Sequence, residues 1–242
     1  MSRADRIADW LKEYAATAGA KGFVFGLSGG VDSAAVAGVA VRAVGADNTL
    51  AALMPCHSAP DDERLGNLVA ETFAIPTVNV DLQPSFDALM QALPHSDSRL
   101  AAANVKPRLR MTVLYYLAQA NGYLVLGTGN KTELEVGYFT KYGDGGCDLL
   151  PLGDLYKTQV WELAAELSVP QEVIDRPPSA GLWEGQTDED EMGITYRDLD
   201  RVLAAIDAGD TSQIDAAALA QVKGMIACSE HKRGLAPICR LE

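Results

Sequence analysis

Short apolar segments alternate along this chain with longer segments of helical character. The short segments, at residues 23–27, 50–54, 76–80 and 123–126, have the length and the apolar or β-branched content of buried strands. The intervening residues 34–44, 61–73 and 98–120 have the composition or periodicity of helices. This alternation predicts an α/β fold, a three-layer α/β/α sandwich with a mostly parallel sheet, and it leaves the strand order open.

Further helical patterns flank this alternation. Residues 3–16 place one apolar face on a helix, which we expect to be buried, through Ile7, Trp10, Leu11 and Tyr14. Pro107 interrupts the pattern at 98–120, so the helix should kink there or a new one should begin. Other helices are predicted at residues 155–167, from Thr187 onward, and at 214–227 before a basic tail.

Two glycine-bearing segments are too polar or too irregular for the core. Residues 138–153 centre on the string Tyr142-Gly143-Asp144-Gly145-Gly146, which predicts a functional loop or a lid. Residues 177–185 begin with two prolines, and their length predicts a second mobile loop. The acidic run at residues 188–191 is interpreted as the first turn of a helix.

Composition narrows the possible classes of protein. The chain has 242 residues, 48% hydrophobic and 22% charged, which favours one folded domain over residues 1–242. A net charge of −13 argues against sequence-independent nucleic-acid binding, although Lys106, Arg108 and Arg110 cluster locally and suit a small anion. We expect a cytoplasmic protein and no membrane partner, because no apolar run approaches about 18 residues and no signal-peptide core is present. The scattered cysteines indicate reduced thiols.

The loop after the first predicted strand carries the clearest chemical signal. Its glycines, Gly29 and Gly30, allow a sharp turn and close approach of a ligand, and the helix that follows offers unpaired N–H groups to an anion. Ser28 and Ser33 add hydroxyl groups. The carboxylate of Asp32 would repel a phosphate unless a divalent cation lay between them, so the loop predicts phosphate together with Mg²⁺.

A second loop of similar design follows the fourth predicted strand. It runs from Gly127 to Glu133 and ends in another carboxylate. Ligands in doubly wound sheets bind outside the carboxyl ends of strands, so the two loops can face one pocket. We therefore expect Asp32 and Glu133 to share a cation there, although Glu133 alone would also suit the first turn of a helix.

The string S-G-G-x-D-S at residues 28–33 resembles the pyrophosphate-binding loop of the ATP pyrophosphatase superfamily, whose members cleave ATP between the α- and β-phosphates. The second loop, the segments 137–146 and 148–152, and the string Glu230-His231-Lys232-Arg233 resemble the NAD synthetase family. This resemblance covers nearly the whole chain. It implies one NAD synthetase domain with an adenine nucleotide alpha hydrolase-like fold, and the absence of a glutaminase segment points to the ammonia-dependent form.

The resemblance also implies a reaction. ATP, as co-substrate, adenylates the nicotinate carboxylate of deamido-NAD, pyrophosphate leaves, and ammonia attacks the adenylate to give NAD⁺ and AMP. The cofactor would be Mg²⁺, held by Asp32 and Glu133. A homodimer is implied, with deamido-NAD, ATP and ammonia as the small-molecule partners.

Matched residue by residue, the resemblance places further roles on this chain. The implied catalytic residues are Asp32, Glu133, Lys157 and Asp144, the last as a candidate for handling ammonium or its proton. ATP contacts are implied for Leu27, Ser28, Gly29, Gly30, Val31, Asp32, Ser33, Ala34, Thr128, Lys157 and Ser179. Deamido-NAD contacts are implied for Arg108, Lys141, Asp148, His231 and Lys232.

Other interpretations remain open at this point. A related ATP pyrophosphatase could amidate or thiolate another acceptor, as GMP synthetase and the tRNA-thiolating enzymes do, although the acidic charge argues against tRNA. A non-catalytic ATP-binding module with the same architecture is a third candidate. Arg108, Lys141 and His231 could each be solvated surface charges instead of ligands.

Overall fold

A parallel sheet forms the centre of the molecule. The computed structural model describes the whole chain except Ala180, Leu182, Glu184, Gln186 and Glu242, so part of the loop predicted at 177–185 lies outside the described residues. Within the described residues, the strands run in the order β3-β2-β1-β4 and are all parallel. They are β1 (Gly22–Gly26), β2 (Thr49–Leu53), β3 (Thr77–Asn79) and β4 (Tyr123–Val125).

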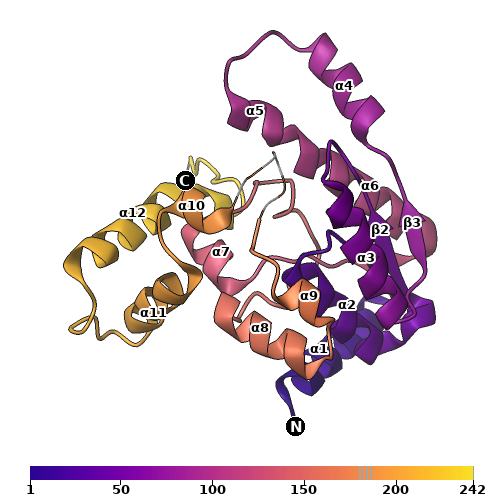
Figure 1. Cartoon of the computed structure of the whole chain (residues 1–242), viewed down its shortest axis with the longest axis horizontal. Coiled ribbons are helices and arrows are strands. Elements are labelled where there is room, and N and C mark those ends of the chain that lie inside the picture. Colours follow the sequence, from indigo (N-terminus) through magenta and orange to yellow (C-terminus); the bar gives the residue numbers. More distant parts are fainter. Residues whose placement is uncertain (180, 182, 184, 186, 242) are drawn as a thin grey trace.

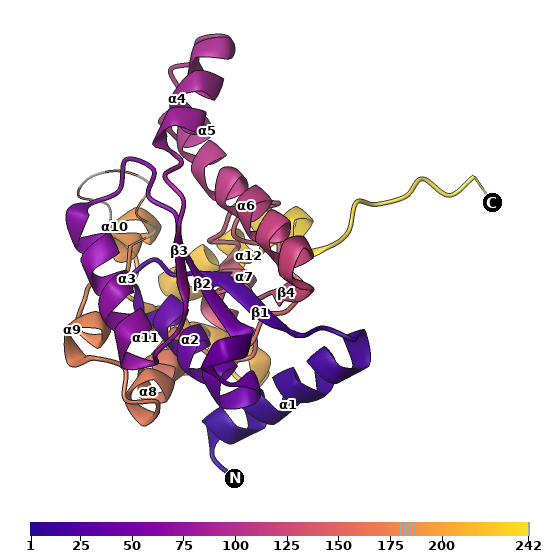
Figure 2. The same ribbon diagram turned by 90° about the vertical axis from the view of Figure 1, so that its right-hand side faces the viewer.

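The alternation of side chains along β1 explains the layers. Phe23 and Phe25 are fully buried on one face of the sheet, in the cluster formed with α1 (Arg3–Ala18), α2 (Val31–Val44), α3 (Pro60–Thr72) and α8 (Lys157–Glu166). Val24, between them, is buried on the other face against α6 (Val105–Asn121). Helices therefore cover both faces (Figure 2), and the predicted three-layer α/β/α fold is confirmed.

The strand order places one edge of the sheet where a ligand can bind. β1 lies between β2 and β4, with Gly26 opposite Ala52 and Val24 opposite Val125. Because the strands are parallel, their carboxyl ends meet at the same edge. The order of strands reverses beside β1, and such a switch point is the usual ligand site of an open α/β sheet.

A new helix begins near Pro107, which was one of the two predicted outcomes, and the other, a kink in one continuous helix, is not observed. The chain forms α5 (Arg99–Ala103) and then α6, in which Pro107 is the third residue. The missing N–H of proline costs nothing there, because the first four N–H groups of a helix have no partner within the helix. The sequence patterns missed α4 (Gln83–Ala92), which with α5 projects from the body of the molecule (Figure 1).

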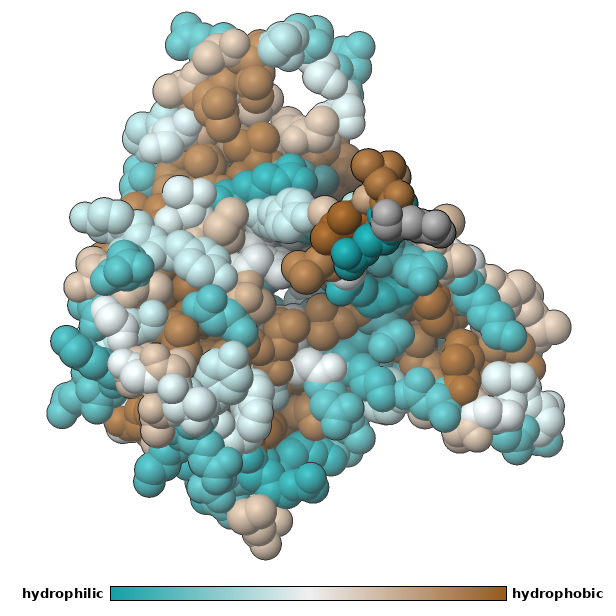
Figure 3. Space-filling view, turned by 180° about the vertical axis from the view of Figure 1, so that it is seen from behind, coloured by the Kyte–Doolittle hydropathy of each residue, from teal (hydrophilic) through white to brown (hydrophobic). Residues whose placement is uncertain are grey.

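The projecting arm formed by α4 and α5 carries exposed apolar side chains. Hydrophobic atoms are visible on this arm from behind (Figure 3). The exposed apolar residues of this arm include Leu89, Leu93 and Leu100, with 38%, 44% and 53% of their surface exposed. None of the helices in the described ranges is long and apolar enough to cross a membrane.

A second hydrophobic cluster lies in the C-terminal half, where the chain forms a group of helices beside the sheet (Figure 1). Its helices are α7 (Lys131–Val136), α10 (Asp188–Met192), α11 (Tyr196–Asp207) and α12 (Ala216–Arg233). The sequence patterns missed α11. The prediction that a basic tail follows the last helix was wrong, because His231, Lys232 and Arg233 form the last turn of α12. The short helices η1 (Ala46–Asn48) and α9 (Gln171–Ile174) complete the elements of the described residues.

The N-terminal helix α1 buries a different face from the expected one. It ends at Ala18 and is capped by Gly19, and Trp10 and Tyr14 are 42% and 44% exposed and pair with each other, with ring centres 6.0 Å apart. The buried residues are Ala4, Ala8, Leu11 and Ala15. Alanines let α1 approach α2 closely, and close packing of backbones here outweighs burial of the aromatic rings.

The junction of α7 with α12 yields a prediction about stability. Gly137 ends α7 with a φ of +70°, and a Cβ there would lie 2.0 Å from the Cβ of Ser229 in α12. Gly137→Ala should therefore lower the free energy of unfolding by about 2 kcal/mol or more, measured by urea denaturation. Gly224→Ala is the matched control: it lies within α12, has no atom within 4 Å of its added Cβ, and should raise stability by up to about 1 kcal/mol. Equal effects of the two substitutions would contradict this account.

Candidate active site

The loop between β1 and α2 has a fixed shape. Gly29 has a φ of +77°, and a Cβ there would lie 2.6 Å from the carbonyl oxygen of Asp62, so glycine is required. The Ser33 hydroxyl donates to the carbonyl oxygen of Gly30 at 2.9 Å and accepts from the backbone N–H of Ser28 at 3.2 Å. The residue that caps α2 is Gly30, which has no side chain to bond the first N–H groups of the helix, and those groups can bind an anion.

Asn130 connects this loop to the second predicted loop. Its side chain is fully buried, and its Oδ1 accepts from the backbone N–H of Glu133 at 3.0 Å. This hydrogen bond caps the first turn of α7. The Glu133 carboxylate accepts in return from the backbone N–H of Asn130 at 3.3 Å. The amide Nδ2 of Asn130 donates to Oδ1 of Asp32 at 2.8 Å. One buried side chain thus sets the relative position of the two predicted cation ligands.

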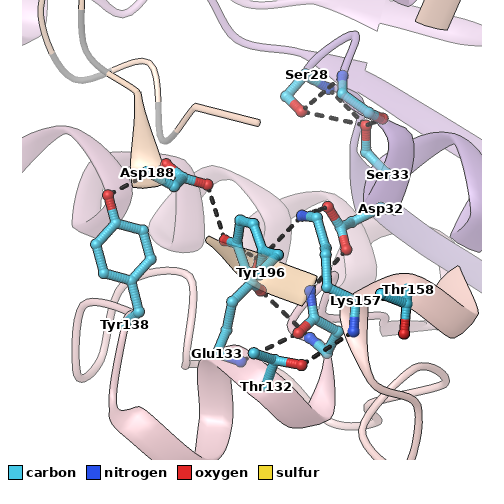
Figure 4. Close-up of polar contacts among 12 residues, drawn as sticks. Ser28, Asp32, Ser33, Thr132, Glu133, Tyr138, Lys157, Thr158, Asp188 and Tyr196 are labelled. Atoms are coloured by element: carbon cyan, nitrogen blue, oxygen red, sulfur yellow. Dashed lines mark hydrogen bonds and ion pairs between the residues drawn. The ribbon is translucent and has the colours of Figure 1, made fainter. Parts of the chain in front are cut away.

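Lys157 lies between these two carboxylates (Figure 4). Its side chain is 2% exposed, and its Nζ is 2.5 Å from Oδ2 of Asp32 and 3.2 Å from Oε1 of Glu133. Lys157 begins α8, where its backbone N–H donates to the hydroxyl of Thr132 at 2.9 Å. The structure therefore brings together three of the four residues expected to be catalytic, from three different elements.

The electrostatics of this centre follow from its burial. Burial raises the pKa of the Glu133 carboxyl; the ammonium of Lys157 opposes that shift, and the charge of Asp32 adds to it. Burial by itself lowers the pKa of Lys157, but the carboxylates of Asp32 and Glu133 more than reverse this and raise it. Lys157 consequently stays charged at neutral pH.

A cavity of about 660 Å³ opens at this edge of the sheet. Most of the expected ATP contacts line it: Leu27, Ser28, Gly30, Val31, Asp32, Ser33, Thr128, Lys157 and Ser179. Gly29 and Ala34 do not line it. Gly29 instead shapes the loop, and Ala34 is fully buried in α2.

Lys232 is the one expected deamido-NAD contact among the residues that line the cavity. Its Nζ donates to the carbonyl oxygens of Gly137 at 2.8 Å and Phe139 at 2.9 Å, and burial lowers its pKa. Asp144, in the glycine-rich loop, also lines the cavity, and removal of its carboxyl from water raises the pKa of that group. The Asp144 carboxylate accepts from the backbone N–H of Thr140 at 3.0 Å.

The other expected deamido-NAD residues lie outside the cavity. Arg108 donates to the carbonyl oxygen of Lys141 at 3.3 Å, and the Lys141 ammonium donates to the carbonyl oxygen of His231, so these three residues form one surface group. Asp148 accepts from the backbone N–H of Val125 at 2.8 Å and from the Tyr115 hydroxyl at 3.1 Å. Its carboxylate therefore extends the edge of the sheet beside β4.

Arg110 lines the cavity, although the sequence placed it only in a local basic cluster suited to a small anion and not among the site contacts. Its Nε donates to the carbonyl oxygen of Met54, at the end of β2, at 3.2 Å. Within the described part of the chain, its terminal nitrogens donate no hydrogen bond to the protein. Residues two positions apart on an α-helix are rotated by about 200° around its axis, so Arg108 and Arg110 lie on opposite faces of α6. That spacing was the available signal.

The residues around Lys157 can accommodate Mg²⁺. Asp32 and Glu133 already converge on one cation, the ammonium of Lys157, and their hard oxygens are what Mg²⁺ prefers. No group of three or more His, Cys, Asp or Glu side chains in the described residues is arranged to hold a metal. The protein would therefore supply two carboxylates, and a nucleotide and water would supply the remaining ligands, which is the common way that Mg²⁺ is held.

Comparison with known proteins agrees with this geometry. The family model described as NAD synthase matches residues 3–236. The chain belongs to the NAD synthase family. Both the glycine-bearing loop and the Asp32–Lys157–Glu133 centre lie within the matched residues.

Named members of the NAD synthase family are similar over almost their whole length. The NH(3)-dependent NAD(+) synthetase of Carboxydothermus hydrogenoformans is 48% identical over 235 residues, which are 96% of this chain and 94% of that protein. A solved NMN synthetase from Francisella tularensis is 38% identical with a TM-score of 0.91, covering 99% of this chain and 98% of that one. The NH3-dependent NAD synthetase from Campylobacter jejuni is 27% identical with a TM-score of 0.86, covering 99% and 100%.

The raised pKa of Glu133 gives this NAD synthase family member a testable pH dependence. The folded pKa lies above the ordinary value of 4.5, so the ligand-free folded state binds a proton more tightly than the unfolded state, and stability is lost as pH rises through the folded pKa. Glu133→Gln removes this loss. Its free energy of unfolding relative to wild type should rise by on the order of 1 kcal/mol or more between about pH 5 and about pH 8 in urea titrations. A difference that does not change with pH would refute the shift.

Proposed function

We propose that this chain is an ammonia-dependent NAD synthetase that converts deamido-NAD, ATP and ammonia into NAD⁺, AMP and pyrophosphate. One observation carries the proposal: a buried lysine and two carboxylates converge beside a glycine-bearing loop in a cavity at the switch point of the sheet. Family membership and the named relatives support the same chemistry. Because ATP is the co-substrate, we place the reaction in the cytoplasm.

The chemistry of the residues fits adenylation. A carboxylate is a poor electrophile and must be activated before ammonia can attack it. In the activating step, the carboxylate oxygen attacks the α-phosphorus of ATP and the bond to the departing pyrophosphate breaks. The first N–H groups of α2 and the Ser28 hydroxyl bind phosphate oxygens, and Lys157 neutralises the charge that develops on the leaving group. Mg²⁺ held by Asp32 and Glu133 would supply further positive charge at the same phosphates.

The second step uses the other side of the cavity. Ammonia attacks the carbonyl carbon of the adenylate, and the bond to AMP breaks. Asp144 lines the cavity and has the charge to bind ammonium or to accept its proton. Its carboxylate orientation is fixed by the N–H of Thr140.

The surface group of Arg108, Lys141 and His231 remains our proposed contact for the part of deamido-NAD that extends beyond the cavity, together with Asp148. Lys232 would meet the dinucleotide inside the cavity. We also propose a homodimer in which a second copy completes this surface. The exposed rings of Tyr115 and Tyr116 on α6 support such an interface, whereas Leu109, Val113, Leu114 and Leu117 of the same helix pack in the core.

A second acceptor follows from one comparison. The solved structure with a TM-score of 0.91 is named an NMN synthetase, so the acid that corresponds to NMN, nicotinic acid mononucleotide, is a candidate substrate. Both acceptors present the same carboxylate to ATP. They differ in the adenylate half, which only the dinucleotide carries.

One assay decides among these functions. The purified protein is incubated with ATP, Mg²⁺ and ammonia and with either deamido-NAD or nicotinic acid mononucleotide, and the amide product and AMP are quantified. We expect NAD⁺ and AMP in equal amounts, a clear preference for deamido-NAD, and almost no product when glutamine replaces ammonia. Asp32→Asn should lower kcat by on the order of 100-fold or more with an unchanged circular dichroism spectrum. Formation of ADP, or near-normal turnover by Asp32→Asn, would reject the mechanism.

Arg110 yields a separate prediction about substrate binding. Its guanidinium is oriented by Met54 and faces the cavity, so it would bind an anionic oxygen of ATP or of deamido-NAD. Arg110→Gln should raise the KM of one of these substrates about tenfold or more, with the affected substrate identifying the contact, and Arg110→Lys should restore part of the loss. Arg201→Gln, a change at an exposed arginine of α11 outside the cavity lining, is the matched control. Unchanged KM values for both substrates would remove Arg110 from the site.

A further inference from the structure

Tyr196 contacts the lysine–carboxylate centre from a helix that supplies none of its members. It is the first residue of α11 and is fully buried. Its hydroxyl is 3.3 Å from Oε1 of Glu133, the same oxygen that meets Lys157. Its ring centre is 4.8 Å from the ammonium of Lys157, which favours the charged form of that residue. Tyr196 therefore touches both partners of one ion pair (Figure 4).

Asp188 holds Tyr196 in this position. The Tyr196 hydroxyl is 2.9 Å from Oδ2 of Asp188, closer than it is to Glu133. A phenol has one proton to donate, and the shorter distance identifies Asp188 as its acceptor. The other oxygen of Asp188, Oδ1, is 3.1 Å from the hydroxyl of Tyr138, which lies closer, at 2.8 Å, to Oε2 of Glu191. Asp188 is only 4% exposed, so these contacts are shielded from water.

The backbone of Asp188 connects the same centre to the nucleotide side of the cavity. Its N–H donates to the carbonyl oxygen of Pro178 at 3.1 Å. Pro178 immediately precedes Ser179, which lines the cavity. One residue thus joins Ser179 to the tyrosine that meets Glu133 and Lys157.

We infer that Asp188 and Tyr196 are positioning residues for nucleotide binding: the hydrogen bond from the Tyr196 hydroxyl to Asp188 holds the tyrosine ring against the ammonium of Lys157 and beside Oε1 of Glu133, and so keeps this ion pair in place for the nucleotide complex. This inference rests on the proposed function. Without that hydrogen bond, Tyr196 and the ion pair that it contacts are no longer held in one position. Neither residue takes part in bond making, since both act through Glu133 and Lys157.

α11 itself provides a matched control. Near its other end, Asp207 accepts a hydrogen bond from the hydroxyl of Tyr156 at 2.7 Å. This is the same tyrosine-to-aspartate chemistry on the same helix, and Tyr156 does not line the cavity. Tyr156→Phe therefore removes a tyrosine-to-aspartate bond that is exposed where that of Tyr196 is buried, at the residue next to Lys157, and its side chain contacts none of the three charged groups of the centre.

The experiment compares Asp188→Asn, Tyr196→Phe, their double variant and Tyr156→Phe. Affinity for α,β-methylene-ATP, which cannot be cleaved between its α- and β-phosphates, is measured by calorimetry, and kcat and KM are measured for ATP and for deamido-NAD. We expect Asp188→Asn and Tyr196→Phe each to weaken binding of the analogue about 5- to 30-fold and to raise the KM of ATP similarly. The double variant should be no worse than the more damaged single variant, because both act through one hydrogen bond. Tyr156→Phe should bind the analogue as wild type does.

Three results would overturn the inference. One is a double variant that shows the product of the two single effects, which is expected if Asp188 acts only through its charge. Another is a Tyr156→Phe variant that weakens binding as much as Tyr196→Phe does, which is expected of a purely structural role. The third is unchanged affinity in both single variants. If Asp188→Asn fails to fold, Tyr196→Phe against Tyr156→Phe still decides, because both keep the ring.

Failure of the proposed function is distinguishable from failure of this inference. Affinity for the analogue depends on the nucleotide alone and needs no acceptor. A wild-type protein that binds the analogue but makes no amide from deamido-NAD would reject the proposed substrate. The comparison among the variants would still be valid.

Discussion

The contact of one buried ammonium with two carboxylates is the interaction on which the cavity depends. Lys157 meets Asp32 at 2.5 Å and Glu133 at 3.2 Å, so a positive charge from α8 is shared by α2 and α7. Removing these charges from water is costly, and the attraction offsets that cost only when geometry and remaining hydrogen bonds are well arranged. Two carboxylates against one ammonium leave an excess negative charge, which a ligand cation would balance. The arrangement is therefore better explained by binding than by stability.

Several buried polar side chains maintain this arrangement. Asp200 of α11 accepts from the Thr132 hydroxyl at 2.5 Å and from the backbone N–H of Thr158 at 2.8 Å, which ties the start of α7 to the start of α8. Asn130 does the same for Asp32 and Glu133. The helical cluster beside the sheet thus has a task besides filling space, because its helix α11 fixes the distance between elements that carry the reacting charges.

The sequence predicted the parts of this site that depend on local chemistry. Buried parallel strands are continuous apolar runs, and the loops at their ends carry glycines and carboxylates, so Asp32 and Glu133 could be assigned to one cavity before the fold was known. Strand order and the convergence of Lys157 depend on packing between distant segments. Periodicity within one segment contains no such information.

Other parts were missed although a signal existed. Buried Leu199, Val202 and Leu203 of α11 recur at helical spacing, and Arg110 follows Arg108 at the spacing that separates two faces of a helix. Asp188 was interpreted only as the first turn of a helix. It does begin α10, but its buried carboxylate contacts two tyrosines, Tyr138, 50 residues before it, and Tyr196, 8 residues after it. Contacts of this kind require the fold.

The glycine turn between β1 and α2 also constrains how chain length can vary within it. Asp32 is the second residue of α2, and each residue of an α-helix is rotated by about 100° from the one before. If a single residue were added between Leu27 and Gly30 and the turn kept its shape, every residue of α2 would advance by one position and the carboxylate would move about a third of a turn around the axis. It would then lie where the Ser33 hydroxyl now bonds the turn, away from Lys157. Insertions are therefore tolerable on the arm of α4 and α5, whereas the turn must keep its present number of residues.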